Sequence, residues 1–258
     1  MNTNRPLILV TNDDGYQSRG LRRLVQLMQP LGDVVSVSTD KPMSAKGHSI
    51  TTTPTLEATL LSETRGYKEY VCNGTPVDCV KLGYQILLDR KPDLVVSGIN
   101  HGSNASTNVI YSGTMGAAIE ACMDGINAIG FSLDNYDPDA YLDHLDETIV
   151  TITKKVLDEG LPKDVCLNVN FPSWRGMPFK GLKVCRQAKG RWVEAYSQST
   201  DENGATCLKM GGEFIFEDEG GDTDFEALND YYVSVVPTHF DMTAKDHLEQ
   251  MRHFEHLI

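Results

Sequence analysis

Short apolar runs alternate with amphipathic stretches in the first two thirds of the chain. Residues Leu7–Thr11 form such a run, and the turn-forming residues 12–15 (Asn-Asp-Asp-Gly) end it, as expected of a strand buried on both faces. Residues 20–28 carry apolar side chains at helical spacing, and Pro30 ends the helix that this spacing predicts. A second apolar run follows over 34–37. The order predicts a strand–helix–strand unit at the start of the chain.

The alternation continues as far as residue 172. Thr75 and Ser112 are suited to cap two further helices. Regular alternation predicts an α/β fold with a doubly wound, mostly parallel sheet, whose ligands bind beyond the carboxyl ends of the strands. Asp13, Asp14 and Asn100 fall at such ends. The remaining elements predicted in this part are strands over 69–72, 93–98, 128–132 and 165–169, and helices over 75–88, 112–122 and 138–159.

The pattern changes after residue 172. Glycine-rich or acidic loops separate short strand candidates, which predicts antiparallel hairpins over 181–186, 192–196, 214–216 and 232–236. Residues 244–257 are predicted to form a terminal helix with an apolar stripe of Leu248, Met251, Phe254 and Leu257. We therefore expect an α/β core at 1–172 that carries the active site, and a β-rich extension with the terminal helix at 173–258.

Charge and apolar content limit the classes of function. The 258 residues carry a formal net charge of −13 at pH 7, so we expect no basic nucleic-acid groove. A phosphate substrate would need a local positive charge, from a bound cation or a helix N-terminus. No apolar run is long enough to span a membrane and no signal-peptide pattern opens the chain, so we expect a cytoplasmic protein. The six scattered cysteines predict buried thiols.

Two adjacent carboxylates, Asp13 and Asp14, follow the first buried strand. A cation would relieve their mutual repulsion, and oxygen ligands favour Mg²⁺ or Mn²⁺. An ordinary Asn-Asp-Asp-Gly turn without a metal is the alternative, because these residue types also favour turns. The pair alone does not decide between the two interpretations.

Three other segments offer polar groups near the same edge of the sheet. Residues 97–104 supply Asn100 among small residues, and we interpret His101 as a loop histidine. The loop over 40–49 contains Ser44. Residues 112–114 open a helix whose free N–H groups suit a phosphate, although plain N-capping by the serine explains the same residues. The sequence contains no P-loop, dinucleotide-binding, α/β-hydrolase or zincin motif.

Four motifs, in this order, resemble those of the survival protein SurE family. They are Leu9–Gly15, Gly74–Cys79, Val96–Asn100 and Ile110–Thr114, and the likeness extends to 168–172, 222–224 and 232–235. The resemblance implies a Rossmann-like core and a divalent-metal-dependent phosphatase that acts on nucleoside 5′- and 3′-monophosphates. It also implies a homodimer or homotetramer built partly by exchanged C-terminal segments.

The resemblance further implies roles for individual residues. Both aspartates would be catalytic, and the phosphate side would use Asn104 and the helix start Ser112, Gly113 and Thr114, with Asn12 supporting the metal loop. Ser18-Arg19 and Ala45 depart from the family pattern, which predicts altered substrate selection. One Mg²⁺ or Mn²⁺ per subunit would be held by Asp13, Asp14, Ser44 and Asn100.

We expect the cation to polarise the phosphoryl group and to lower the pKa of a water that attacks phosphorus, while the helix start stabilises the developing charge. Two alternatives stay open. One is a non-catalytic metal- or nucleotide-binding module, against which the intact Asp13, Asp14 and Asn100 argue. The other is a phosphohydrolase for another substrate, such as a sugar phosphate or short polyphosphate, which only the substrate pocket distinguishes.

Overall fold

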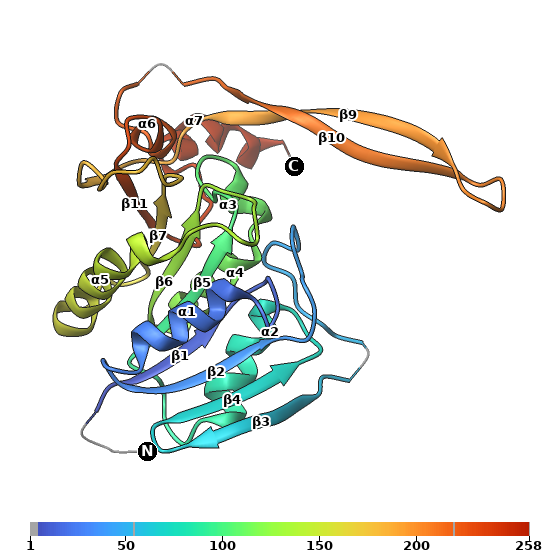
Figure 1. Cartoon of the computed structure of the whole chain (residues 1–258). Coiled ribbons are helices and arrows are strands. Elements are labelled where there is room, and N and C mark those ends of the chain that lie inside the picture. Colours follow the sequence, from blue (N-terminus) through green and yellow to red (C-terminus); the bar gives the residue numbers. More distant parts are fainter. Residues whose placement is uncertain (1–4, 54, 219, 258) are drawn as a thin grey trace.

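A nine-stranded sheet with helices on both faces forms the body of the protein (Figure 1). The computed structural model describes residues 5–53, 55–218 and 220–257. The strand order is β3-β4-β2-β1-β5-β6-β7-β11-β8. The six strands from β4 to β7 in this order run parallel, which confirms the predicted α/β class with a mostly parallel sheet. These strands are β1 (Leu7–Thr11), β2 (Asp33–Thr39), β4 (Tyr67–Cys72), β5 (Leu94–His101), β6 (Asn127–Leu133) and β7 (Cys166–Phe171).

Two of the main helices begin at the caps that the sequence indicates, Thr75 and Ser112, and a third begins at Ser18. The Ser18 side chain accepts a hydrogen bond from the Leu21 N–H, Thr75 forms a capping box with Asp78, and Ser112 caps the next helix. The helix predicted over 138–159 starts later than predicted, after a 3-10 turn at Asp143–Leu145. The four main helices are α1 (Arg19–Met28), α2 (Pro76–Leu82, continued by a π-helical turn at Gly83–Leu87), α4 (Gly113–Met123) and α5 (Asp146–Glu159).

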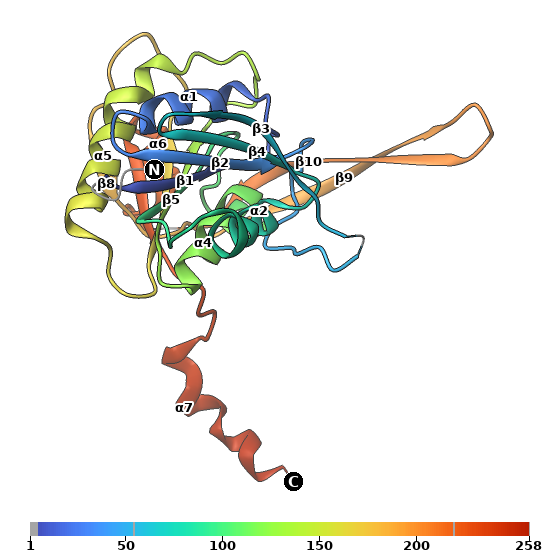
Figure 2. The same ribbon diagram turned by 90° about the horizontal axis from the view of Figure 1, so that it is seen from below.

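Two apolar layers hold the helices against the sheet. The side chains of β1 alternate between them: Ile8 and Val10 belong to the layer under α1 and α5, and Leu7 and Leu9 to the layer under α2 and α4. Figure 2 shows these helix pairs on opposite sides of the sheet. Because both faces of β1 are covered, its run is continuously apolar, as a doubly wound sheet requires.

Three elements were not predicted, and each is weakly marked in the sequence. Strand β3 (Ala58–Thr64) is an exposed edge strand antiparallel to β4, so its side chains have no buried face. Helices α3 (Asn108–Tyr111) and α6 (Asp224–Asn229) are too short for an amphipathic pattern.

The part after residue 172 differs from the predicted set of hairpins. Strands β8 (Leu182–Val184) and β11 (Val233–Thr238) join the main sheet, with β11 antiparallel to β7 and β8 parallel to β11. The one hairpin of this part of the described chain pairs β9 (Gly190–Thr200) with β10 (Thr206–Phe216), both longer than predicted. We call this hairpin the arm, because it projects far from the body in both views (Figures 1 and 2).

The chain end is not the continuous helix that the stripe predicts. Helix α7 covers only Leu248–Met251, between 3-10 turns at Lys245–His247 and Arg252–His256. Figure 2 shows this end standing away from the body. More than half of the surface of each stripe residue, Leu248, Met251, Phe254 and Leu257, is exposed. The stripe therefore does not pack on the chain's own core.

The predicted burial of the cysteines is confirmed only in part. All six cysteines are free thiols; five are buried as predicted, whereas Cys207 lies exposed on the arm. The described residues contain no helix that is both long and apolar enough to cross a membrane.

Candidate active site

A cavity of about 630 Å³ opens at the carboxyl ends of β1 and β5, beside the first turn of α4. The arm contributes to its lining through Trp192, Glu194 and Met210. Several residues predicted for the site line it: Asp13, Ser44, Asn100, Asn104 and Ser112. Two strand ends and a helix start thus meet where a doubly wound sheet binds its ligands.

Asp13 is the most strongly perturbed group of this cavity. It lies two residues beyond the end of β1, is only 4% exposed, and accepts a hydrogen bond of 2.6 Å at Oδ1 from the Thr114 hydroxyl. Burial, and then the neighbouring carboxylate of Asp14, raise the pKa of Asp13 from 3.8 to about 6, against hydrogen bonds from Thr114 that lower it. No positively charged side chain is among the causes.

Asp14 turns toward the end of β5. Its Oδ2 lies 3.3 Å from the backbone N of His101, which donates to it, and 3.4 Å from the ring atom Nδ1. The other ring nitrogen, Nε2, is buried and has no hydrogen-bond partner within the described chain. His101 is the last residue of β5 and lines the cavity, so it is not the loop histidine of the sequence interpretation. Its place directly after Asn100 was the available signal.

Asn12 and Gly113 determine the immediate surroundings of Asp13. The Asn12 amide is buried and donates to the Gly15 carbonyl at 3.0 Å and to the Ser18 hydroxyl at 2.8 Å, so it holds the turn rather than facing the cavity. A Cβ at Gly113 would lie 2.9 Å from both Cβ and Oδ2 of Asp13. Only glycine lets α4 approach this carboxylate so closely.

A bulge in β5 sets the position of Asn100. The pairing with β6 shifts between Ser97 and Asn100, where Gly98 takes φ +126°. The Asn100 Nδ2 then donates to the Gly102 carbonyl at 2.7 Å, which leaves Oδ1 as the amide atom for a cation.

The loop that carries Ser44 is hydrogen-bonded to Asp13, to the end of α3 and to α4. The Met43 N–H donates to the Asp13 carbonyl at 2.7 Å, and the Gly47 N–H donates to the Tyr111 carbonyl at 3.0 Å. His48 Nε2 lies 2.8 Å from a carboxylate oxygen of Glu120 on α4. Ser44 itself is exposed and lines the cavity.

The polar side chains at the start of α4 are already hydrogen-bonded within the chain, which the sequence does not show. The Ser112 hydroxyl accepts from the Met115 N–H at 3.0 Å, so the serine acts as the N-cap, and the Thr114 hydroxyl is engaged by Asp13. Asn104 donates from Nδ2 to the Ser132 hydroxyl at 2.8 Å, and its backbone N–H donates to Asn170 at 2.8 Å. Of the four residues expected at the phosphate, Ser112 and Asn104 border the cavity.

The donor set agrees with a hard divalent cation. Across residues 5–53, 55–218 and 220–257, no group of three or more His, Cys, Asp or Glu residues is placed to hold a metal. The residues predicted to bind a cation offer two carboxylates, from Asp13 and Asp14, and neutral oxygens from Ser44 and Asn100. Mg²⁺ and Mn²⁺ prefer such oxygen ligands. A cation here would also supply the countercharge that the buried Asp13 lacks.

Three aromatic residues also line the cavity and were not found from the sequence. Tyr111 is the last residue of α3, Tyr136 lies beyond the end of β6, and Trp192 lies on β9 of the arm. Exposed aromatic residues in a one-turn helix, a loop and a two-stranded arm carry no burial pattern, so nothing in the sequence separates them from other surface residues.

Comparison with known proteins agrees with the geometry. The family model described as "Survival protein SurE" matches residues 8–194. The chain is 52% identical over 253 residues to the 5′-nucleotidase SurE of Christiangramia forsetii, covering 97% of both proteins. It is 50% identical over 252 residues to the 5′-nucleotidase SurE of Flavobacterium psychrophilum, covering 97% of the chain and 98% of the relative.

A solved structure shares the fold as well. The crystal structure of the SurE protein from Aquifex aeolicus superposes with a TM-score of 0.81 at 37% identity, over 97% of this chain and all of the other. The match to the family model covers well over half of the chain, and the identity to the relatives extends over nearly all of it. The chain therefore belongs to the survival protein SurE family.

Proposed function

We propose that the protein is a divalent-metal-dependent phosphatase that hydrolyses nucleoside 5′- and 3′-monophosphates to nucleoside and phosphate. The observation that carries the proposal is Asp13, a carboxylate that is only 4% exposed, lines the cavity and adjoins a second carboxylate, that of Asp14. Relatives that match nearly the whole chain bear the name 5′-nucleotidase SurE, which supports the substrate class.

In this proposal Asp13, Asp14, Ser44 and Asn100 hold one Mg²⁺ or Mn²⁺ per subunit. The cation supplies Lewis-acid activation of the phosphoryl group and of water. Asp13 is kept in place by the Thr114 hydroxyl and by the close approach of Gly113. Asn12 fixes the turn that carries both aspartates.

The phosphate end of the substrate lies at the start of α4 in this proposal. The N–H groups of the first helical turn point toward an anion there and add the positive end of the helix dipole. Ser112 uses its hydroxyl for capping and its N–H for a hydrogen bond to the Val109 carbonyl, so the N–H of Gly113 is the group proposed to contact the phosphate. Asn104 borders the cavity, and its bonds to Ser132 and Asn170 hold it rigidly.

We further propose that the protein forms a homodimer or homotetramer through its C-terminal part, as the sequence resemblance implies. The exposed stripe Leu248, Met251, Phe254 and Leu257 supports this, because a helical segment with such a stripe needs an apolar partner surface. Residues 1–172 remain the proposed active-site core and 173–258 the proposed oligomerisation part, although β8 and β11 extend the core sheet.

Phosphate release from a panel of substrates tests the proposal. The panel contains nucleoside 5′- and 3′-monophosphates, short polyphosphate and sugar phosphates, each with Mg²⁺, Mn²⁺ or chelator. We expect turnover of both classes of nucleotide with either metal and none with chelator. Absence of turnover with every substrate would indicate a binding module, and a clear preference for polyphosphate or sugar phosphates would refute the nucleotidase assignment.

A further inference from the structure

The arm forms part of the cavity that holds the proposed active site. Trp192 and Glu194 lie two residues apart on β9 and so share one face of the arm, and both line the cavity. Gly212, the cross-strand partner of Glu194, lines it too, as do Met210 and Gly211. Asp13 lines the same cavity, just beyond the carboxyl end of β1.

The arm is joined directly to the loop that follows Asn104. The Ser106 hydroxyl donates to the Ala188 carbonyl at 3.0 Å, and the Thr107 hydroxyl donates to the Gly190 carbonyl at 3.0 Å. The Trp192 indole N–H donates to the Asn108 side chain at 2.8 Å, which fixes the ring. These three bonds form what we call the arm junction, between residues 106–108 and 188–192.

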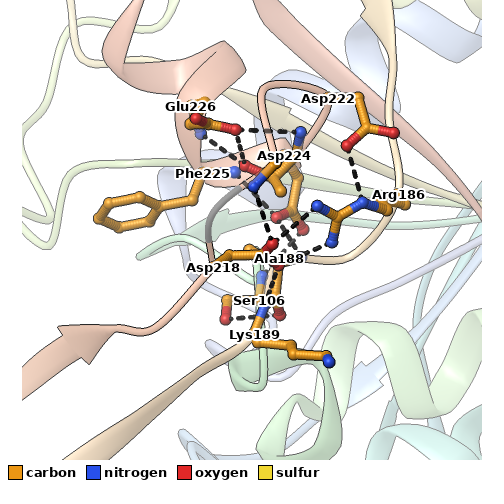
Figure 3. Close-up of polar contacts among 11 residues, drawn as sticks. Ser106, Arg186, Ala188, Lys189, Asp218, Asp222, Asp224, Phe225 and Glu226 are labelled. Atoms are coloured by element: carbon orange, nitrogen blue, oxygen red, sulfur yellow. Dashed lines mark hydrogen bonds and ion pairs between the residues drawn. The ribbon is translucent and has the colours of Figure 1, made fainter.

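Asp224 lies at the centre of the arm junction (Figure 3). Its carboxylate accepts from the backbone N–H of Ser106 at 2.8 Å, of Ala188 at 3.0 Å and of Phe225 at 2.8 Å. The residue is fully buried, and it belongs to α6, which packs on the main sheet. The Asp224 side chain therefore links Ser106 to Ala188, and α6 connects both of them to the main sheet.

A second group of charged residues closes the base of the arm. The Arg186 guanidinium donates to both carboxylate oxygens of Asp218, and through Nε it donates to Asp222 (Figure 3). Asp218 also accepts from the Lys189 N–H at 2.8 Å. These bonds link the two ends of the arm to each other, whereas Asp224 and the arm junction link the arm to residues 106–108.

We propose that the inner face of the arm, formed by Trp192, Glu194 and Met210, binds the nucleoside part of the substrate, and that Asp224 is the positioning residue that sets this face across the cavity from Asn104. The inference rests on the proposed nucleotidase function and adds the subsite for the base. A phosphate held at α4 leaves the rest of a nucleotide to extend toward this wall. Trp192 offers an aromatic surface for stacking there, and stacking on an aromatic ring tolerates every base.

The kinetics of two substrates that share a phosphorylated ribose test the subsite. Adenosine 5′-monophosphate carries a base and ribose 5-phosphate does not. Because stacking of one base on an aromatic side chain changes affinity by roughly fivefold to a hundredfold, we expect wild type to prefer the nucleotide by a factor in this range. Trp192→Ala should remove most of this preference through a higher KM for the nucleotide, with kcat/KM for ribose 5-phosphate unchanged.

Val193→Ala is the matched control for this measurement. Val193 is the next residue of β9, points to the opposite face and is about as exposed as Trp192, at 40% against 37%. It should leave both substrates unaffected. An unchanged nucleotide KM in Trp192→Ala, or an equal loss in Val193→Ala, would overturn the subsite while leaving the phosphatase proposal intact. Hydrolysis of neither substrate by wild type would refute the proposed function itself, and this inference with it.

Two variants test the positioning role. Asp224→Asn weakens the acceptor for three N–H groups, and Thr107→Val removes a single bond of the arm junction without changing the shape of the side chain. Both should raise the nucleotide KM by more than the ribose 5-phosphate KM, with kcat nearly unchanged. Thr107→Val decides the question if Asp224→Asn does not fold. An equal change in KM for the two substrates would overturn the role of Asp224 in placing the arm.

Discussion

Replacing Asp13 by asparagine should raise the stability of the metal-free protein while abolishing its activity. The buried carboxylate has a raised pKa because it is desolvated and lies next to Asp14. Asparagine keeps the shape of the neutral carboxyl group and cannot become charged. A site built to hold a cation is thus expected to weaken the fold when the cation is missing.

The size of the effect follows from the pKa of Asp13, raised from 3.8 to about 6. One pKa unit corresponds to about 1.4 kcal/mol, so the ionised carboxylate costs about 3 kcal/mol in the folded state. A group with a raised pKa contributes stability below its unfolded pKa, and this contribution is lost as the pH rises through the folded pKa. The gain from Asp13→Asn should therefore be about 3 kcal/mol at pH 7.5, about half of that at pH 5 and below about 1 kcal/mol at pH 4.

Urea unfolding in chelator at these three pH values measures the difference between wild type and Asp13→Asn. Asp158→Asn, which removes an exposed carboxylate from α5, is the control and should change the free energy of unfolding by less than about 0.5 kcal/mol. Added Mg²⁺ or Mn²⁺ should stabilise wild type and not the Asp13 variant. The reasoning would be refuted if Asp13→Asn were less stable than wild type in chelator at pH 7.5.

Three further outcomes are expected. Chelation should abolish phosphate release and Mg²⁺ or Mn²⁺ should restore it; activity that survives chelation would exclude the metal mechanism. Thr114→Val and Asn104→Ala should each lower kcat about tenfold or more, because they remove bonds that hold groups of the site in place; unchanged kinetics in both would reduce the start of α4 to a plain helix cap. A chain ending before Thr243 should have a smaller mass in light scattering, and an unaltered mass would show that the terminal segment does not assemble the oligomer.

The parallel core could be predicted because burial leaves a regular trace in the sequence. Leu7–Thr11 and the runs that pair with it are apolar on both faces, and the caps Ser112 and Thr75 mark where helices begin. Strand β3 and the arm could not be bounded in this way, because most of their residues are exposed. The terminal stripe shows the reverse case: its spacing is helical, yet the α-helix covers only Leu248–Met251.

The aspartate end of the site was predictable, and the arm end was not. Asp13, Asp14 and Asn100 stand at strand ends, and the fold itself brings such ends together at one edge of the sheet. Trp192 reaches the cavity only through the arm junction, which depends on contacts between residues about 80 positions apart. No local pattern records a contact of that kind.

The charges around the start of α4 indicate why a cation would be needed for binding as well as for chemistry. The N-terminus of a helix carries about half a positive charge. Asp13 already faces that end through Thr114, with Asp14 beside it, so the local charge without a cation is negative and a phosphate dianion is repelled. A divalent cation on the two carboxylates would cancel their charge and leave the helix end free to attract the phosphate. Metal and phosphate should then bind with positive coupling, so calorimetry should detect inorganic phosphate binding only when Mg²⁺ or Mn²⁺ is present, and equal affinity in chelator would contradict this view of the site.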